Sequence, residues 1–398
     1  PYAEEDFRIR LNTDKEKQLA LEIAEQGIVL LKNDGVLPLS GNGKRIALIG
    51  PNADINELGN YIYYDIGELA GKPPCVTSAT ETLRFALSRR AGRENVLYAR
   101  GCSTVYRSDT LLEEALKIAN SADVVVLAMG SNSRQIGGGT PENVVAAVKK
   151  CETTSGEGYD MPYVELPACQ RELIEKIAET GKPIVLLLYG GRAHAIAEET
   201  EKVQAILQVF GPGEMGGKAI AELLFGDKSP SGKLPFSMPR STGHIPCFYN
   251  HKPSARGSLY RHPGNKFCMG MDYVTDTPQA LFPFGYGISY THFSYSALTA
   301  KRETKGIRVF VRIKNDGEYD AYESVLLFVR CHYRKVTPPV KELKAFRKIF
   351  LKKGEEQEVI FSLSVRDFEY YDENMKAISG KGRYTVFISE LSMEVEIK

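Results

Sequence analysis

The sequence predicts an open α/β sandwich with a mostly parallel sheet, followed by a smaller all-β sandwich. Short apolar runs alternate with amphipathic segments as far as about Leu234. A stretch rich in proline, glycine, tyrosine and histidine follows, without periodicity. From Phe293 onwards, apolar and polar residues alternate with a period of two, which is typical of half-buried strands. At 398 residues the chain is long enough for two separately packed cores.

Four apolar runs in the first part predict buried strands, and they cover residues 45–50, 123–130, 184–189 and 203–210. Helical segments lie between them, including one that we expect Thr110 and Glu113 to cap and another over 170–180. This alternation implies parallel strands with helices on both faces of the sheet. Ligands bind at the carboxyl ends of such strands, so the loops after Gly50, Gly130 and Tyr189 are candidate sites.

The first predicted helix begins at a capping box formed by Thr13 and Glu16. Its apolar stripe is expected to pack on the rest of the fold, through Leu19, Ala20, Ile23, Ala24 and Gly27. In the last part, the alternation at Ile307, Val309, Val311 and Ile313 predicts a strand. A turn at 315–317 and a returning run at 325–329 follow, and two further runs complete a sandwich of roughly 100 residues.

Charge and cysteine usage exclude several classes of protein. Lysine and arginine number 51 against 50 aspartates and glutamates, so the sequence has no electrostatic footprint for nucleic acid or an anionic membrane. No apolar run approaches the ~20 residues of a membrane span. The 7 cysteines are scattered without a CxxC pair, which predicts mostly free thiols and slightly favours a cytoplasmic over a periplasmic or secreted location.

No cofactor or metal is expected. The glycine run at 137–139 does not open a GxGxxG fingerprint, and Gly216-Gly217-Lys218 lacks the serine or threonine of a phosphate loop. Zinc-capable atoms do occur downstream of the predicted sheet. Their spacing is irregular and interrupted by prolines, which argues against a metal site at Cys247, His251, His262 and Cys268.

Several segments, taken together and in order, resemble glycoside hydrolase family 3. They are GIVLLKND at 27–34, LPL at 37–39, IGPNAD at 49–54, GPGEMGG at 211–217, LFGD at 224–227, PSGKLP at 230–235 and the segment 282–290. The resemblance implies an α/β sandwich at 15–245, a structured connector at 246–290 and a fibronectin type III-like sandwich at 291–398. It also implies that 1–14 is a linker from an N-terminal (β/α)8 barrel that carries the nucleophilic aspartate.

Retaining glycosidases use two carboxyl groups ~5 Å apart, one as nucleophile and one as proton donor. The segment SGEGYD at 155–160 matches the part of the family that carries the donor, which implies that Glu157 is the general acid/base. Gly156 and Gly158 would let this loop reach a neighbouring domain. Read alone, Glu157 is a solvated turn residue. The family segment commonly continues Asp-Arg, whereas Met161 follows here, and 137–154 resembles an insertion.

Residues around this loop are candidates for substrate contact. Tyr159 is expected to stack on the aglycone, and Asp160 to hold the loop. Asp54, after the first strand, is expected to touch the sugar. For each of the three the alternative is a structural role. Weaker candidates are Asn52, Asn60, Tyr61, Arg134 and Gln135, and the carboxylates that rival Glu157 are Glu142, Glu152 and Glu165.

The sequence therefore predicts the C-terminal part of a retaining, exo-acting β-glucosidase, with a β-linked oligosaccharide or glycoside as substrate. A β-xylosidase of the same family is the first alternative. The second is a noncatalytic sugar-binding module, which an encoding frame that begins near Pro1 would favour. We expect the barrel to be the partner of this chain and the chain alone to be inactive, while the sequence leaves a homo-oligomer open.

Overall fold

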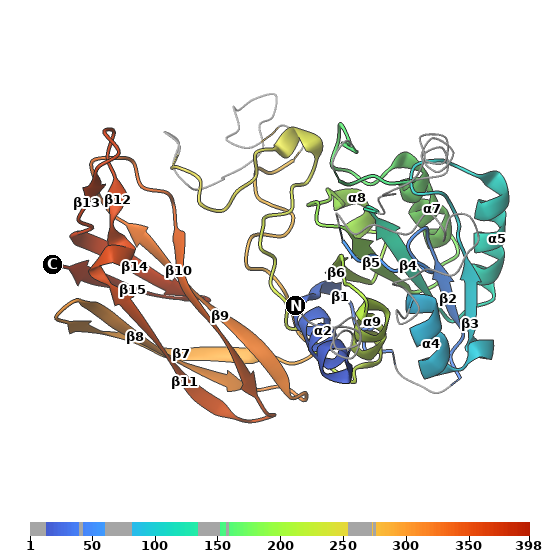
Figure 1. The fold of residues 1–398 in the computed structure, drawn as a ribbon, viewed down its shortest axis with the longest axis horizontal. Coiled ribbons are helices and arrows are strands. Elements are labelled where there is room, and N and C mark those ends of the chain that lie inside the picture. The colour runs from blue at the N-terminus through green and yellow to red at the C-terminus, as the bar shows by residue number, and fades with distance from the viewer. Residues whose placement is uncertain are drawn as a thin grey trace, which may run out of the picture. The chain divides into compact units, whose positions relative to one another are not determined.

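The computed structural model describes residues 13–39, 43–59, 82–133, 152–156, 159–253, 273 and 276–398. Of these, the residues up to Gly232 and the short stretch Arg240–Gly243 form one compact unit. The stretch Lys233–Pro239 and the residues from His244 onwards form a second (Figure 1). The four-part domain division expected from the sequence stays a prediction.

The first unit contains a six-stranded sheet in the order β1-β6-β5-β4-β2-β3. The strands are β1 (Val29–Asn33), β2 (Ile46–Ile49), β3 (Val96–Ala99), β4 (Val124–Gly130), β5 (Ile184–Tyr189) and β6 (Ala205–Phe210). All neighbours are parallel except β1, which runs antiparallel to β6. The four predicted strands are confirmed as β2, β4, β5 and β6. The two edge strands β1 and β3 were not predicted.

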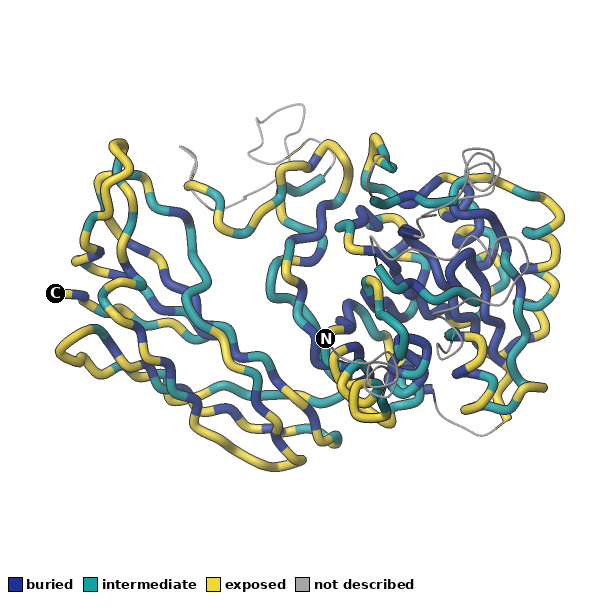
Figure 2. The backbone as a smooth tube through the Cα atoms, viewed as in Figure 1, coloured by how far each residue is buried: buried dark blue, intermediate teal, exposed yellow. Residues whose placement is uncertain are grey.

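Helices cover both faces of this sheet, as predicted. On one face lie α2 (Asp14–Gly27), α4 (Leu83–Ala91) and α9 (Gly216–Phe225), and α9 packs against both of the others. On the other lie α5 (Asp109–Asn120), α7 (Ala168–Ala178) and the short α8 (Ala197–Thr200) (Figure 1). Burial by the two layers explains why β2, β4 and β5 are apolar throughout, and these strands form the dark-blue interior in Figure 2.

The helix ends agree only in part with the sequence patterns. The capping box of α2 is present as predicted, with Thr13 and Glu16 bonding to each other's backbone N–H groups. Helix α5 begins two residues earlier than expected, because the Ser108 hydroxyl, and not that of Thr110, caps it. Helix α7 begins at Ala168 without a side-chain cap. A 3-10 turn at η1 (Arg93–Asn95) leads from α4 into β3.

The buried face of α2 differs from the prediction. Leu21, Ala24 and Glu25 are buried, whereas Leu19 and Ile23 are 56% and 65% exposed. The side chain of Glu25 meets Glu222 of α9, and burial together with this second carboxyl group raises the pKa of Glu25 to about 8. Helix α2 thus packs on α9 through a face that includes a protonated carboxyl group, and the more apolar stripe lies outside.

The second unit is an antiparallel sandwich. A four-stranded sheet, in the order β10-β9-β14-β15, faces a three-stranded sheet in the order β11-β8-β7. Its strands are β7 (Phe293–Glu303), β8 (Gly306–Asn315), β9 (Ala321–Cys331), β10 (Glu342–Leu351), β11 (Glu356–Ser364), β14 (Gly382–Ile388) and β15 (Leu391–Ile397). Short elements complete it, namely η3 (Val365–Phe368), β12 (Tyr370–Tyr371) and β13 (Ala377–Ile378). The 3-10 turn η2 (Thr242–His244) begins in the first unit and ends at His244, which belongs to the second.

The predicted alternation in β8 is confirmed, since Ile307, Val309, Val311 and Ile313 all point into the sandwich core. The predicted run at 325–329 is confirmed as part of β9. Strand β8 pairs with β7 and β11, while β9 lies in the opposite sheet. The turn at Asn315 carries the chain from one sheet to the other, because this buried side chain bonds to several segments at once.

No helix in the described parts of the chain is long and apolar enough to cross a membrane. Nor do the described histidine, cysteine, aspartate and glutamate side chains form a group of three or more that could hold a metal ion.

Candidate functional site

The order of the strands places the candidate site between β2 and β4. From β2 the chain moves outward to β3, and from β3 it returns across β2 to β4. Ligands bind at such a switch point, beyond the carboxyl ends of the strands. The backbone is closely packed there: a Cβ atom added to Gly50 would lie 2.3 Å from the Ala128 carbonyl oxygen, so only glycine fits.

Polar side chains are buried at this edge. Asn52 is fully buried and its Nδ2 lies 3.5 Å from the Ser131 carbonyl oxygen, while its Oδ1 has no hydrogen-bond partner among the described residues. Glu57, 3% exposed, accepts hydrogen bonds from the hydroxyl and the backbone N–H of Ser133, the latter at 3.2 Å. Burial, and secondarily the Glu57 carboxylate, raises the pKa of the adjacent Tyr189. Glu57 was not singled out from the sequence.

A serine and a histidine join β4 to the loop after β5. The Ser131 hydroxyl lies 3.1 Å from His194 Nε2, and His194 Nδ1 lies 3.2 Å from the Val164 carbonyl oxygen. Burial lowers the pKa of His194 to about 4, so the ring is neutral near pH 7. A neutral ring donates from Nδ1 to Val164 and accepts from Ser131 at Nε2. The pair therefore holds the residue 164 backbone to the sheet edge.

Residues 152–156 and 159–170 are described on either side of 157–158, and the carboxylate of Glu152 fastens the first of these stretches. Glu152 accepts hydrogen bonds of 2.6 Å from Arg100 and from the Thr104 backbone N–H. Burial alone would raise the pKa of Glu152, but the bonds from Thr104, Ser103 and Arg100 outweigh it and hold the pKa below 4.5. Glu152 is thus an anion that ties the segment to the turn after β3.

Two further contacts fix the chain just beyond Glu152. Thr154 and Asn132 exchange hydrogen bonds, from the Asn132 N–H to the Thr154 hydroxyl at 3.0 Å and from the Thr154 N–H to the Asn132 carbonyl at 2.8 Å. Arg192, in the loop after β5, donates to the Thr154 carbonyl at 3.2 Å. The loops after β4 and β5 therefore both hold Thr154, and Arg192 is a further site residue that the sequence did not reveal.

The second end of the segment is held as firmly. Glu165 accepts hydrogen bonds from the Thr242 backbone N–H at 2.7 Å and from its hydroxyl at 2.5 Å. Gln170, fully buried, accepts from the Gly130 N–H at 2.7 Å and donates to the carbonyls of Gly130 and Thr104 at 3.0 and 2.8 Å. Glu152 and Gln170, on either side of residues 155–160, are therefore both bonded to the turn at Thr104.

Residues 155–160 include the principal residues predicted from the sequence. Gly156 has a φ angle of 129°, which favours glycine, and its carbonyl accepts a 3.1 Å hydrogen bond from the Tyr159 N–H. Tyr159 is half-buried and Asp160 is exposed. Burial lowers the pKa of Arg192, and the nearby Asp160 carboxylate partly offsets that shift. Glu157 lies outside the described residues, as do Asn60, Tyr61, Arg134, Gln135 and Glu142.

Asp54 is engaged by protein groups. The Thr82 hydroxyl donates to its Oδ1 at 2.8 Å, and Arg84 donates to its Oδ2 at 2.8 Å. These bonds tie the loop after β2 to the start of α4. That Asp54, Tyr159 and Asp160 contact the sugar stays a prediction.

The described carboxylates that rival Glu157 are unsuited to donating a proton. Burial raises the pKa of Glu165, but the Thr242 hydroxyl and N–H lower it further, so the group is ionised. Glu152 is ionised in the same way. A general acid has to be protonated at the working pH. Both side chains therefore act as hydrogen-bond acceptors that fix the segment.

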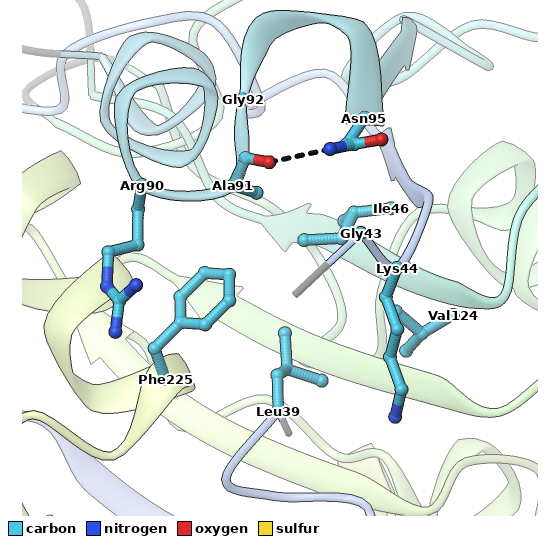
Figure 3. A pocket seen from close by; sticks show the side chains of 10 residues that line it. All are labelled: Leu39, Gly43, Lys44, Ile46, Arg90, Ala91, Gly92, Asn95, Val124 and Phe225. Carbon is cyan, nitrogen blue, oxygen red and sulfur yellow. Dashed lines mark hydrogen bonds between the residues drawn. The ribbon is translucent and has the colours of Figure 1, made fainter. Parts of the chain in front are cut away.

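Two hollows lie away from the switch point. One, of about 400 Å³, opens at the amino ends of β2 and β4 and is lined by Lys44, Arg90 and Phe225 among others (Figure 3). There Arg90 pairs with Asp227 at 3.0 Å. The other, of about 470 Å³, adjoins the second end of 152–170, where Tyr163 lines it. Neither is bordered by residues 50–54 or 131–133, so neither is the candidate site.

Comparison with known proteins agrees with the resemblance drawn from the sequence. A model of the glycosyl hydrolase family 3 C-terminal domain matches residues 28–290, and one of a fibronectin type III-like domain matches residues 323–392. A β-xylosidase of Formosa agariphila is 32% identical over 401 residues, which cover 98% of this chain and 50% of that protein. A periplasmic β-glucosidase of Salmonella typhimurium is 32% identical, with 97% and 50% covered.

Solved structures show the same relation. A mutant β-glucosidase of Listeria innocua, in complex with laminaribiose, superimposes with a TM-score of 0.82 and 28% sequence identity, over 99% of this chain and 51% of that one. The chain spans about half the length of the curated relatives it matches. It therefore belongs to glycoside hydrolase family 3, and it contains that family's C-terminal α/β domain followed by a fibronectin type III-like domain.

Proposed function

We propose that this chain forms the C-terminal part of a retaining, exo-acting β-glucosidase and supplies its general acid/base, Glu157. The nucleophilic aspartate lies on an N-terminal (β/α)8 barrel of the same enzyme. Family membership supports the reaction class, and the names of the relatives, β-glucosidase and β-xylosidase, support the substrate class. The substrate is a terminal β-linked sugar of an oligosaccharide or glycoside.

In this proposal Glu157 acts twice. It first protonates the glycosidic oxygen while the aspartate attacks the anomeric carbon, so that the leaving group departs as an alcohol and a covalent glycosyl-enzyme forms. As a carboxylate, Glu157 then takes a proton from water, whose oxygen attacks the same carbon and releases the sugar with retained configuration. One side chain therefore has to stand close to the leaving oxygen and later to the incoming water.

The observation that carries the proposal is the attachment of 152–170 at both ends to the carboxyl edge of the parallel sheet. Glu152 and Gln170 both bond to Thr104. A loop with fixed ends delivers its tip to a reproducible position, which matters because small misplacement of a catalytic group costs a large part of the rate. Gly156, with its positive φ angle, turns the chain at the tip.

The test is the Glu157→Ala variant of the full-length enzyme, assayed on aryl β-glucosides of graded leaving-group ability. We expect kcat/KM to fall about 10³-fold for phenyl glucoside and much less for dinitrophenyl glucoside, which scarcely needs protonation. Azide should restore part of the turnover on the activated substrate, because it attacks the intermediate without base assistance. Glu165→Gln is the matched control, with a loss that does not depend on the leaving group.

An equal loss on all leaving groups, without azide rescue, would show that Glu157 is not the acid/base. A full-length enzyme that binds oligosaccharides and hydrolyses none would favour the sugar-binding module instead.

β-Xylosidase activity is the second candidate, because relatives of both names share 32% identity with this chain. A glucosidase accommodates the hydroxymethyl group that xylose lacks. We expect kcat/KM to be higher on aryl β-glucoside than on aryl β-xyloside with the same leaving group. The opposite ratio would assign the enzyme to xylosides and leave the role of Glu157 unchanged.

A further inference from the structure

Two cysteine thiols lie together at the turn after β3, next to the end of the segment 152–170. Cys102 lies in the turn after β3, and Cys169 lies in the first turn of α7, where 152–170 ends. Their side chains are hydrogen-bonded to one another, and the residues are 3% and 7% exposed. Cys169 Sγ also lies 3.6 Å from the Ser103 carbonyl oxygen. The proposed glycosidase reaction uses neither thiol.

The two thiols are not equivalent. The hydrogen bond between them raises the pKa of Cys102 and lowers that of Cys169. The N-terminal turn of α7 adds the positive end of the helix dipole, together with hydrogen bonds from the backbone N–H groups of Cys169 and Gln170. Of the two thiols, Cys169 is therefore the more readily ionised and the better nucleophile.

We propose that Cys102 and Cys169 form an oxidisable dithiol that closes to a disulfide on reaction with a peroxide. The pair joins two segments that are far apart in the sequence and already packed together. A zinc site is disfavoured, because no third metal-ligating side chain joins the pair among the described residues.

The reaction is balanced with hydrogen peroxide as the oxidant. Cys169 gives up its thiol proton as its sulfur attacks one peroxide oxygen, an S–O bond forms, the O–O bond breaks, and the departing hydroxide takes up that proton as water. The Cys102 sulfur then attacks Cys169 sulfur, an S–S bond forms, the S–O bond breaks, and the departing hydroxide takes the Cys102 proton as water. Two thiols lose two electrons in total, and one peroxide becomes two waters.

The disulfide would act on the segment that carries Glu157. The turn 100–104 already holds Glu152 and Gln170 by hydrogen bonds. A covalent bond at Cys169 fixes the same turn to α7 and closes a long loop, which lowers the entropy of the unfolded chain. The site of oxidation stands independently, whereas any effect on catalysis rests on the proposed function.

The test treats the full-length protein with hydrogen peroxide, blocks free thiols by alkylation without reductant, and maps the peptides by mass spectrometry. We expect a Cys102–Cys169 linked peptide, two hydrogens lighter than the sum of its parts, which dithiothreitol separates. The melting temperature should rise by roughly 5 °C or more on oxidation and fall again on reduction. Cys331→Ser, at a buried thiol in the other unit, should leave the cross-link intact, and Cys102→Ser should abolish it.

Cross-linking to a different cysteine, or oxidation of Cys169 to the sulfinic acid without a cross-link, would overturn the proposal. So would full alkylation of both thiols after peroxide treatment. The wild-type peptide map decides the outcome even where a serine variant fails to fold. The peptide map measures no hydrolysis, so a failure of the disulfide proposal is distinguishable from a failure of the proposed glycosidase function.

Discussion

The two units of this chain use buried polar side chains differently. In the β-sandwich, Asn315 bonds to Thr291, to the Tyr319 and Leu351 carbonyls and to the Gly317 N–H, and Glu323 accepts from Tyr295 and pairs with Lys233. These groups join strands and turns of one fold. In the α/β unit, buried polar groups gather at one sheet edge, where Gln170 and Thr154 bond to the chain at and just beyond the end of β4. Buried hydrogen bonds therefore stabilise the fold itself in one unit and fix the position of the candidate site in the other.

The largest effect is expected from removing one such group in each unit. Gln170→Leu leaves the Gly130 N–H and the Gly130 and Thr104 carbonyls without their hydrogen-bond partner, and Asn315→Leu does the same to a comparable set of groups. Each variant should therefore lower the free energy of unfolding, measured by urea denaturation, by about 4 kcal/mol. Only Gln170→Leu should also lower kcat on aryl β-glucoside, by tenfold or more. If Asn315→Leu lowers kcat equally, the contrast between the units fails.

The pH dependence of His194 is the next largest effect. Its folded pKa of about 4 lies below the ordinary 6.5, so between these values the unfolded chain binds a proton that the folded chain does not. Stability should therefore be complete above pH 6.5 and fall by about 3 kcal/mol as the pH drops to 4. Unfolding free energy measured against pH should show this slope in the wild type and lack it in His194→Gln. If the unfolding free energy of His194→Gln falls with pH as steeply as that of the wild type, other titratable groups and not His194 cause the loss of stability in acid.

The smallest effect on stability, with a clear effect on activity, is expected from Glu152→Gln. The anchor bond to Arg100 is partly exposed, so its loss should cost about 1 kcal/mol of stability. Because the folded pKa of Glu152 lies below 4.5, the wild-type anchor contributes above pH 4.5 and is lost as the pH falls through that lower pKa.

At neutral pH we expect kcat to fall about tenfold in Glu152→Gln while KM stays close to the wild-type value, because the loop tip is less well placed. Arg308→Ala, which removes a surface pairing with Glu303 in the other unit, serves as the control. A change in KM alone would mean that Glu152 affects substrate binding and not the position of the tip.

Sequence patterns predicted elements that follow from local chemistry. Apolar runs identified β2, β4, β5 and β6 because both faces of these strands are covered by helices. The capping box of α2 needs only Thr13 and Glu16, three residues apart. Edge strands β1 and β3 were missed because β1 ends in the polar residues Lys32 and Asn33 and most of β3 is half-exposed.

Features set by tertiary structure could not be predicted in this way. Helix α2 turns Leu21 and Glu25 towards α9, although Leu19 and Ile23 form the more apolar stripe. The chain crosses from β8 in one sheet to β9 in the other at Asn315, whose side chain bonds to the Tyr319 and Leu351 carbonyls. A local sequence pattern does not specify these partners.

The same limit holds at the candidate site. The family resemblance pointed to the loop 155–160, but not to Arg192 or Glu57, which reach the site from the loops after β5 and β2. Nothing adjacent to them in the sequence distinguishes them from the other charged residues of the chain. Only the strand order brings these loops together at one edge of the sheet.

The central claim is that the tip held between Glu152 and Gln170 delivers a general acid/base, Glu157. The most direct measurement is the product formed by full-length Glu157→Ala from dinitrophenyl β-glucoside in the presence of azide, identified by NMR. The account predicts β-glucosyl azide, formed faster as azide concentration rises. Glucose as the only product, at a rate that azide does not change, would contradict it.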